Sequence, residues 1–328
     1  MTTITDATGR TERAGHFRED ALLTVEDLHC SFKTSSGTVN AVRGVSFDVL
    51  PGETLGLVGE SGCGKTTTGR AVLQLPPGRS GSIRFDGREL AGLPRRELRS
   101  IRGDVQMIFQ DPLSSFNPRR KVVDIVAEGL EVQGVPRSEI PGRVAEALGQ
   151  VGLSTEMVGD RRPHEFSGGQ CQRISIARAL ALNPKLIVCD EPVASLDVSV
   201  QARVLNVLLD IRERNGLSLV FVSHDLAVVR VVSDRIAVMC RGRVVEIGDA
   251  DLVYGNPAHP YTRKLLDAVP VMDEAERPYA GGWSPTPVDD TWRTKDHDLV
   301  EVEPGHYAAL GPETTTGPVP AGRTRKGA

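Results

Sequence analysis

The chain has 328 residues and a formal net charge of −4, a length that supports one large α/β domain or two modest ones. Aromatic residues make up only 4%, which favours buried parallel strands covered by helices over an aromatic-rich β-sandwich. The mild acidity gives no general electrostatic reason to expect nucleic acid as a partner, and no apolar run approaches the roughly 20 residues that span a bilayer.

The N-terminal third predicts a disordered lead followed by short strands. Residues 1–20 are polar and charged, without the apolar core of a secretory signal. β-rich runs follow at 21–28, 41–50 and 54–59, and the last of these enters a glycine-rich loop. A helix is expected over about 65–75, and then strands in "SIRFDG" and "VQMIFQ".

The middle of the chain predicts a helical insertion between two halves of a sheet. Apolar residues recur at three- and four-residue steps between about 120 and 182. Strand character returns in "KLIVCDEP", followed by an amphipathic helix and by the strands "LSLVFVSHD" and "DRIAVMCRGRVVEIG". Residues 285–328 lack periodicity and predict a disordered tail. There is no internal repeat, so we expect a single nucleotide cassette.

A phosphate-binding loop is predicted where the third strand meets its helix. The residues fit the pattern GxxxxGK[ST], in which glycines let backbone amides converge on phosphates. Lys65 is expected to reach the β- and γ-phosphates, and the Thr66 hydroxyl to hold Mg²⁺. A chance loop is the alternative, which the strand and helix on either side disfavour. The loop residues are Gly59, Glu60, Ser61, Gly62, Cys63, Gly64, Lys65, Thr66 and Thr67.

Two acids end the apolar run "LIVCDEP". A buried strand that delivers acids at its carboxyl end is typical of nucleotide sites. We expect Asp190 to hold Mg²⁺, directly or through water, and Glu191 to polarise the attacking water. By itself the pair is also a common turn, and the phosphate loop makes the catalytic interpretation the favoured one.

The run "FSGGQCQRISIARAL" resembles the signature motif of the ATP-binding cassette (ABC) superfamily. Ser167, Gly168, Gly169 and Gln170 would open a helix whose hydroxyl and amides form a second anion-binding end. The resemblance implies further roles: Gln110 as the glutamine that touches Mg²⁺, Asp197 at a dimer seam, His224 beside the γ-phosphate, and Phe32 stacked on adenine. Strand-end, capping and core-packing roles are the alternatives for Gln110, His224 and Phe32.

The same resemblance implies an α/β P-loop NTPase fold with a mainly parallel core sheet, an antiparallel β subdomain and an inserted helical subdomain at about 113–182. It also implies that ATP and Mg²⁺ are the cofactors and that Lys65, Glu191 and His224 are catalytic. Two cassettes would pack head to tail, so that the signature helix of one covers the nucleotide on the phosphate loop of the other. Each ATP would then be sandwiched between subunits.

Within this superfamily the chain looks most like the ATP-binding subunits of bacterial dipeptide, oligopeptide and nickel importers, above all in "NPAHPYTRKLLDAVP". The resemblance implies a cassette over 21–255 and an extension over 256–284. The implied partners are two membrane permease subunits, a second ATPase (a copy or a relative) and, indirectly, an extracellular solute-binding protein, with no nucleic acid. The site of action would be the cytoplasmic face of the cell membrane, with residues 111–123 lining the permease groove.

Several alternatives and departures bear on this interpretation. No cysteine follows Cys240, so we expect no iron–sulfur cluster, although some relatives carry one. ABC proteins of DNA repair insert a long coiled coil, those of translation carry two cassettes, and a simple kinase lacks the signature. An ABC exporter fits the "HPYT" segment poorly. The transported solute, and whether the ATPase pairs with itself or with a relative, stay open from the sequence.

Overall fold

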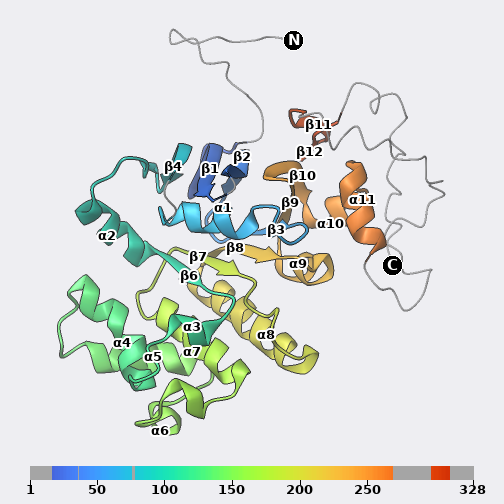
Figure 1. Cartoon of the computed structure of the whole chain (residues 1–328). Coiled ribbons are helices and arrows are strands. Elements are labelled where there is room, and N and C mark those ends of the chain that lie inside the picture. The colour runs from blue at the N-terminus through green and yellow to red at the C-terminus, as the bar shows by residue number, and fades with distance from the viewer. Residues whose placement is uncertain (1–16, 36, 76–77, 269–296, 311–328) are drawn as a thin grey trace.

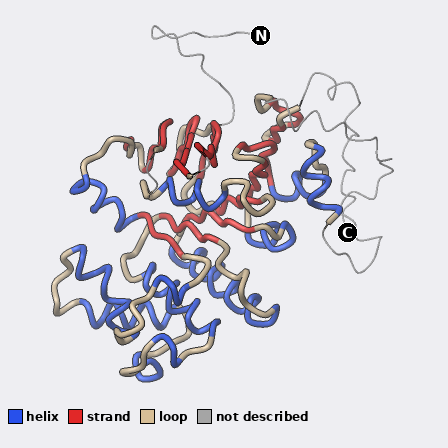
Figure 2. Tube along the Cα trace, in the orientation of Figure 1, coloured by secondary structure: helices blue, strands red, loops and turns tan. Residues whose placement is uncertain are grey.

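A large mixed sheet organises the molecule. The computed structural model describes residues 17–35, 37–75, 78–268 and 297–310, and within them eight strands form one sheet (Figure 2). In spatial order these strands are β11 (Val300–Glu303), β12 (His306–Ala308), β10 (Arg243–Asp249), β9 (Arg235–Cys240), β3 (Thr54–Val58), β8 (Ser218–Ser223), β7 (Leu186–Asp190) and β6 (Val105–Ile108).

The centre of this sheet is parallel and buried on both faces. β3 pairs in parallel with β8 and β9, and β7 pairs in parallel with β6 and β8. Side chains alternate between the faces of a strand: Ile187 and Cys189 join the core beneath the helical region, whereas Leu186 and Val188 join the core on the opposite face. A strand with two buried faces must be apolar throughout, as β7 is until Asp190.

A second, antiparallel sheet lies on one side of the first (Figure 1). Its β1 pairs with both β2 and β4, and β4 pairs with β5. Figure 1 also shows a separate helical region below the large sheet. The predicted fold is therefore confirmed. The bounds of the small sheet are β1 (Leu23–Thr34), β2 (Gly37–Val49), β4 (Arg79–Phe85) and β5 (Arg88–Glu89).

Helices cover both faces of the large sheet. α1 (Lys65–Val72) packs against β7 and β8 on one face, while α7 (Gly168–Leu180) and α8 (Val198–Asn215) contribute to the core on the other. The remaining helices are α2 (Arg95–Asp104), α3 (Pro112–Ser115), α4 (Val122–Gln133), α5 (Ile140–Gln150), α6 (Thr155–Val158), the 3-10 helix η1 (Pro163–Glu165), α9 (Leu226–Val232), α10 (Ala250–Gly255) and α11 (Pro260–Asp267).

Part of the C-terminal tail is folded, so the expectation of disorder over 285–328 is wrong for residues 297–310. β12 pairs with β10 and with β11, and its first residue, His306, is fully buried. The His306 ring bonds the buried Glu246 (Nε2 to Oε1, 2.7 Å). The short, charged sequence "VEVEPGHYA" conceals these strands because few of its side chains are apolar, and the buried His306–Glu246 pair helps to hold them. The rest of the predicted tail and residues 269–284 lie outside the described residues.

The predicted disordered lead over 1–20 is also wrong for its last residues, 17–20. The Arg18 guanidinium pairs with Asp48 (2.7 Å) and Glu53 (2.6 Å). Both acids are buried, and Arg235 reaches them from β9 at 3.1 and 3.2 Å. Buried carboxylates need such partners, so Arg18 belongs to the folded cassette. Residues 1–16 lie outside the described residues.

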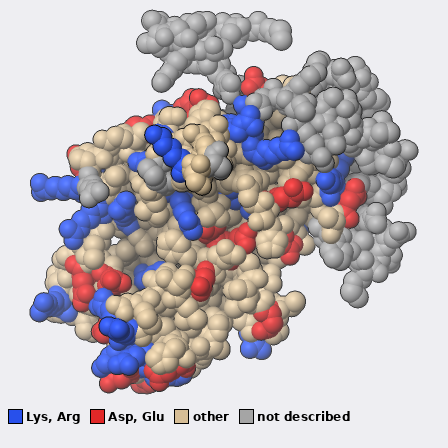
Figure 3. All heavy atoms as spheres, viewed as in Figure 1, with Lys and Arg blue, Asp and Glu red and all other residues tan. Residues whose placement is uncertain are grey.

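The surface carries mixed charge. In Figure 3 basic side chains gather along the edge formed by α2, and acidic ones lie elsewhere on the same face. In the parts of the chain that the structure describes, no helix has both the length and the apolar character needed to cross a bilayer.

Candidate nucleotide site

The phosphate loop joins β3 to α1, as the sequence predicted. Two of its glycines are fixed by close approaches to neighbouring backbone. A Cβ on Gly59 would lie 2.2 Å from the Met239 carbonyl oxygen, and one on Gly64, which has φ of +107°, would lie 2.3 Å from the Ala41 carbonyl oxygen. Only glycine allows the loop to sit between β2 and the end of β9.

Lys65, the first residue of α1, is buried inside this loop. Its side chain is 3% exposed, and its Nζ donates hydrogen bonds to the carbonyl oxygens of Gly59 (2.6 Å) and Glu60 (2.9 Å). Because this buried ammonium group is hydrogen-bonded to neutral carbonyl groups, it can exchange them for an anionic partner at little further desolvation cost. The loop therefore holds a ready cation next to its own backbone amides.

Thr66 and Asp190 meet where α1 passes the end of β7. The Thr66 hydroxyl donates to Asp190 Oδ1 at 2.8 Å, and Arg70 lies 3.9 Å from the other carboxylate oxygen. Asp190 is 2% exposed; this burial raises its pKa, against the hydrogen bond from Thr66 and the charge of Arg70, which lower it. A hydroxyl and a carboxylate side by side are oxygen ligands of the kind Mg²⁺ prefers, so the donor set fits this cation.

Residues at the C-terminal ends of three adjacent strands meet at the side-chain carboxylate of Glu191. Gln110 follows β6, Glu191 follows β7 and His224 follows β8. Glu191 Oε2 accepts a hydrogen bond from Gln110 Nε2 (3.2 Å) and lies 3.3 Å from His224 Nδ1. Glu191 has φ of +48°, a region that non-glycine residues rarely adopt. Such strain marks functional positions, and here it places the carboxylate between its neighbours.

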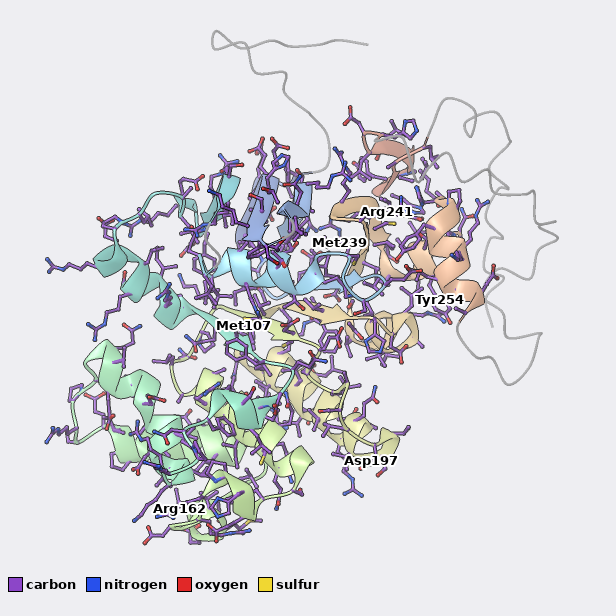
Figure 4. All side chains as sticks on the ribbon, viewed as in Figure 1. Met107, Arg162, Asp197, Met239, Arg241 and Tyr254 are labelled. Carbon is purple, nitrogen blue, oxygen red and sulfur yellow. The ribbon has the colours of Figure 1, made fainter. Side chains whose placement is uncertain are left out.

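The signature residues start α7 on the other side of the sheet. Ser167 caps the helix in a capping box, in which its Oγ accepts from Gln170 N (3.3 Å) and Gln170 Oε1 accepts from Ser167 N (2.9 Å). A Cβ on Gly169 would lie 2.3 Å from Val200 Cγ1 of α8. Asp197 caps α8 through Val200 N (3.0 Å), and Figure 4 shows it below the large sheet, well away from Met239 of β9.

Comparison with known proteins agrees with this arrangement. The chain is 50% identical over 263 residues to the oligopeptide transport ATP-binding protein OppF of Escherichia coli, covering 77% of this chain and 78% of that protein. It is 46% identical to the protein of the same name from Bacillus subtilis, covering 88% of this chain and 95% of that one. The chain belongs to the ABC ATPases of the oligopeptide and dipeptide importer family.

Two family descriptions divide this ABC ATPase along its length. "ABC transporter" matches residues 42–194, and "Oligopeptide/dipeptide transporter, C-terminal region" matches residues 245–289. A solved structure of the dimeric ATP-binding cassette MJ0796 bound to ADP and phosphate has a TM-score of 0.62 and 27% identity, covering 70% of this chain and 98% of that one. That similar cassette was solved as a dimer.

The predicted site residues of this ABC ATPase fall into separate groups. The phosphate loop, Thr66, Asp190, Glu191, Gln110 and His224 lie together, and the signature residues lie with Asp197. Phe32 stands apart: it sits in β1 opposite Val39, near the end of the β1–β2 hairpin, and is partly buried. Its contact with adenine stays a prediction.

Sequence reasoning missed two contacts to this site. Arg70, one turn along α1 from Thr66, approaches Asp190, and Tyr261 hydrogen-bonds the phosphate loop from α11. Arg70 follows the phosphate loop at helical spacing, which was a usable signal. Tyr261 belongs to the "HPYT" segment, which marks the branch but carries no pattern that assigns a role.

Proposed function

We propose that the chain hydrolyses ATP to power the import of peptides or related small solutes through a membrane transporter. The observation that carries the catalytic part is the convergence of Gln110 and His224 on one oxygen of Glu191. We assign the solute class from the names of the similar proteins. In the proposed assembly this chain does not contact the solute itself. The cassette spans 21–255, and residues 256–284 are its family-specific extension.

In the proposed binding step, phosphates take the place of the loop's own carbonyl groups as partners of Lys65. Its ammonium turns from the carbonyls of Gly59 and Glu60 toward the β- and γ-phosphates, while the amides of residues 62–67 and the start of α1 face the same anion. Residues 59–67 supply the cradle. Phe32 is the proposed adenine contact.

Mg²⁺ bound by Thr66 and Asp190, with Gln110, would neutralise charge on the phosphates. The buried Asp190 carboxylate keeps its place through the Thr66 hydroxyl. When nucleotide is bound, this hydroxyl is free to turn its lone pairs toward the cation, because its proton already points at Asp190.

In the proposed hydrolytic step Glu191 orients a water molecule toward the γ-phosphorus and accepts its proton. The bond between the γ-phosphorus and the bridging oxygen breaks, giving ADP and phosphate. Gln110 and His224 both contact Oε2 of this carboxylate. His224, whose side chain is 56% exposed, is open to a γ-phosphate. Both groups therefore sense whether that phosphate is present.

We propose that two ATPases pack head to tail, with Ser167 to Gln170 of one covering the nucleotide of the other. Ser167 and Gly168 are exposed at the N-terminal end of the helix that they begin. Beside Asp197, Val198 is 83% exposed, an arrangement that suits a surface covered in a dimer. The second ATPase is a copy or a relative of this chain.

The proposed contact with the two permease subunits uses residues 111–123. Asp111 caps α3 and Leu113 is 48% exposed. Arg178 of the signature helix donates to the Ser115 carbonyl oxygen (3.0 Å), so α7 holds this segment. A movement of Gln110 would thus reach a docking surface at the cytoplasmic face of the membrane, and the extracellular solute-binding protein would be linked only through the permeases.

Glu191→Gln tests the catalytic assignment. The amide keeps the size of the side chain but cannot take a proton, so ATP turnover should fall at least about 100-fold with ATP affinity retained. Glu213→Gln, on an exposed position of α8, is the matched control and should leave turnover unchanged. Normal hydrolysis by Glu191→Gln would remove Glu191 from its proposed role.

A further inference from the structure

Within the described residues, the family-specific C-terminal segment (256–284) hydrogen-bonds the phosphate loop. The hydroxyl of Tyr261, in the first turn of α11, accepts a hydrogen bond from the backbone N–H of Glu60 at 3.0 Å. Tyr261 is 2% exposed, whereas Glu60 lies at the surface, so the bond is partly buried. It joins residues about two hundred positions apart in the chain.

This bond fixes the same peptide group that holds Lys65. The Gly59 carbonyl, at one end of the Gly59–Glu60 peptide, accepts from Lys65 Nζ at 2.6 Å, and the Glu60 N–H at the other end donates to Tyr261. A peptide group is planar, so fixing its N–H fixes the direction of its carbonyl. Tyr261 therefore helps to orient the Gly59 carbonyl group that accepts the hydrogen bond from Lys65.

The outer residues of the loop, 60–62, are exposed and loosely packed on the side that faces α11. A cavity of about 350 Å³ opens between residues 60–63 and the side of α11 that carries Tyr261 and Lys264. A Cβ on Gly62 would have nothing within 4 Å. Residues 60–62 thus have room to move toward α11. Lys65 ties the Gly59 and Glu60 carbonyl groups within the loop, and the Tyr261 bond ties Glu60 to α11.

Tyr261 is itself held by a buried polar network (the Glu246 network: Glu246, His259, His306 and Glu303). Glu246 accepts from the backbone N–H groups of Ala258 (2.7 Å) and His259 (2.9 Å) and bonds the His306 ring. The His259 ring accepts from Tyr261 N (3.0 Å) as the cap of α11. Figure 1 shows α11 beside the β9–β10 end of the sheet, where this network lies.

We propose that Tyr261 is a positioning residue for nucleotide binding, which makes the C-terminal segment a support of the phosphate loop. The proposal rests on the assignment of residues 59–67 as that loop. Without the Tyr261 hydroxyl, the Gly59–Glu60 peptide samples other orientations. Only part of the population then presents Lys65 and the loop amides correctly, which lowers apparent nucleotide affinity.

Tyr261→Phe in the full-length chain removes only the hydroxyl. We expect the dissociation constant for MgADP, measured by titration calorimetry, and the KM for ATP to rise about 3- to 10-fold, the range for one lost hydrogen bond. The kcat should change by less than about 2-fold, since Tyr261 touches no reacting atom. Hydrogen exchange of a peptide covering residues 59–64 should accelerate in the absence of nucleotide.

Tyr254→Phe is the matched control. Tyr254, in α10 just before the extension, is also a largely buried tyrosine, and its ring packs under the Arg230 guanidinium. Its variant should match the wild type in all three measurements. Unchanged affinity in Tyr261→Phe would overturn the proposal, whether or not exchange changes. Lys65→Ala tests the loop assignment separately: full nucleotide binding by that variant would refute the assignment, while the exchange result for Tyr261→Phe would still report the contact.

Discussion

His259 makes the attachment of the C-terminal segment sensitive to acid. It is 2% exposed, and burial lowers its pKa to about 4. Its Nδ1 accepts a hydrogen bond from the Tyr261 N–H. A protonated Nδ1 could not accept this bond, and two N–H groups would then face each other. In the unfolded chain histidine binds a proton near pH 6.5. The neutral ring therefore stabilises the folded state fully above pH 6.5, and this contribution is lost as the pH falls toward 4.

His259→Asn separates this effect from packing. Asparagine is a favoured helix cap and can accept the same N–H, but it does not titrate. From the two pKa values, the wild type should lose about 2 kcal/mol more than His259→Asn in free energy of unfolding between pH 7.5 and pH 5. Any cost of the smaller side chain is the same at each pH and cancels in this comparison.

Urea denaturation of both proteins at several pH values measures the difference. The carboxylates that titrate near pH 4 to 5 are shared by both proteins and also cancel. The gap between the two unfolding free energies should change steadily below pH 6.5 in favour of His259→Asn. Parallel pH profiles would refute the reasoning and show that His259 takes its proton in the folded state without cost.

Three further outcomes follow from particular contacts. Burial lowers the pKa of His306, but its bonds to Glu246 and Glu303 outweigh this and raise that pKa. The contribution of His306 to folding stability is therefore complete below pH 6.5 and declines as the pH rises through the folded pKa. In urea denaturation, His306→Ala should cost about 3 kcal/mol at pH 6 and less at pH 9. Gly59→Ala places a methyl group 2.2 Å from the Met239 carbonyl oxygen and should lower the free energy of unfolding by about 2 kcal/mol or more. Gly62→Ala meets no described atom within 4 Å and should cost about 1 to 2 kcal/mol for its φ of +81° alone. Equal losses of stability in the two variants would contradict the steric reason. All five cysteines are buried, so an aromatic disulfide reagent should react with native protein far more slowly than with unfolded protein, and fast labelling of the native state would count against this packing.

The sequence predicted those parts of the site that local patterns specify. The phosphate loop, the acids after β7 and the signature helix each combine a short motif with an adjoining strand or helix. Strand order then follows from the fold, so the approach of Gln110 and His224 to Glu191 was implied once the strands carrying them were neighbours. The resemblance to a known superfamily implied that Gln110 and His224 lie at the nucleotide, but no strand order was predicted from the sequence.

Local sequence patterns could not predict contacts between segments that are far apart in the chain. Arg18 completes a cluster with the buried Asp48 and Glu53, and His306 pairs with Glu246. Each pair consists of polar residues that look like ordinary surface positions in the sequence. The Tyr261 contact is similar, because one hydroxyl and one backbone N–H leave no periodic signal. Single buried polar pairs therefore help to hold residues 17–20 and 297–310 in the fold.

The central claim is that a nucleotide on one ATPase is completed by the signature helix of the next. The most direct measurement is the structure of the assembled transporter with MgATP, carrying Glu191→Gln to retain the nucleotide. We expect the Ser167 hydroxyl and the amides of Gly168 and Gly169 to contact the γ-phosphate of ATP seated on the partner ATPase. An ATP-bound assembly in which these residues face solvent, away from both nucleotides, would contradict the claim.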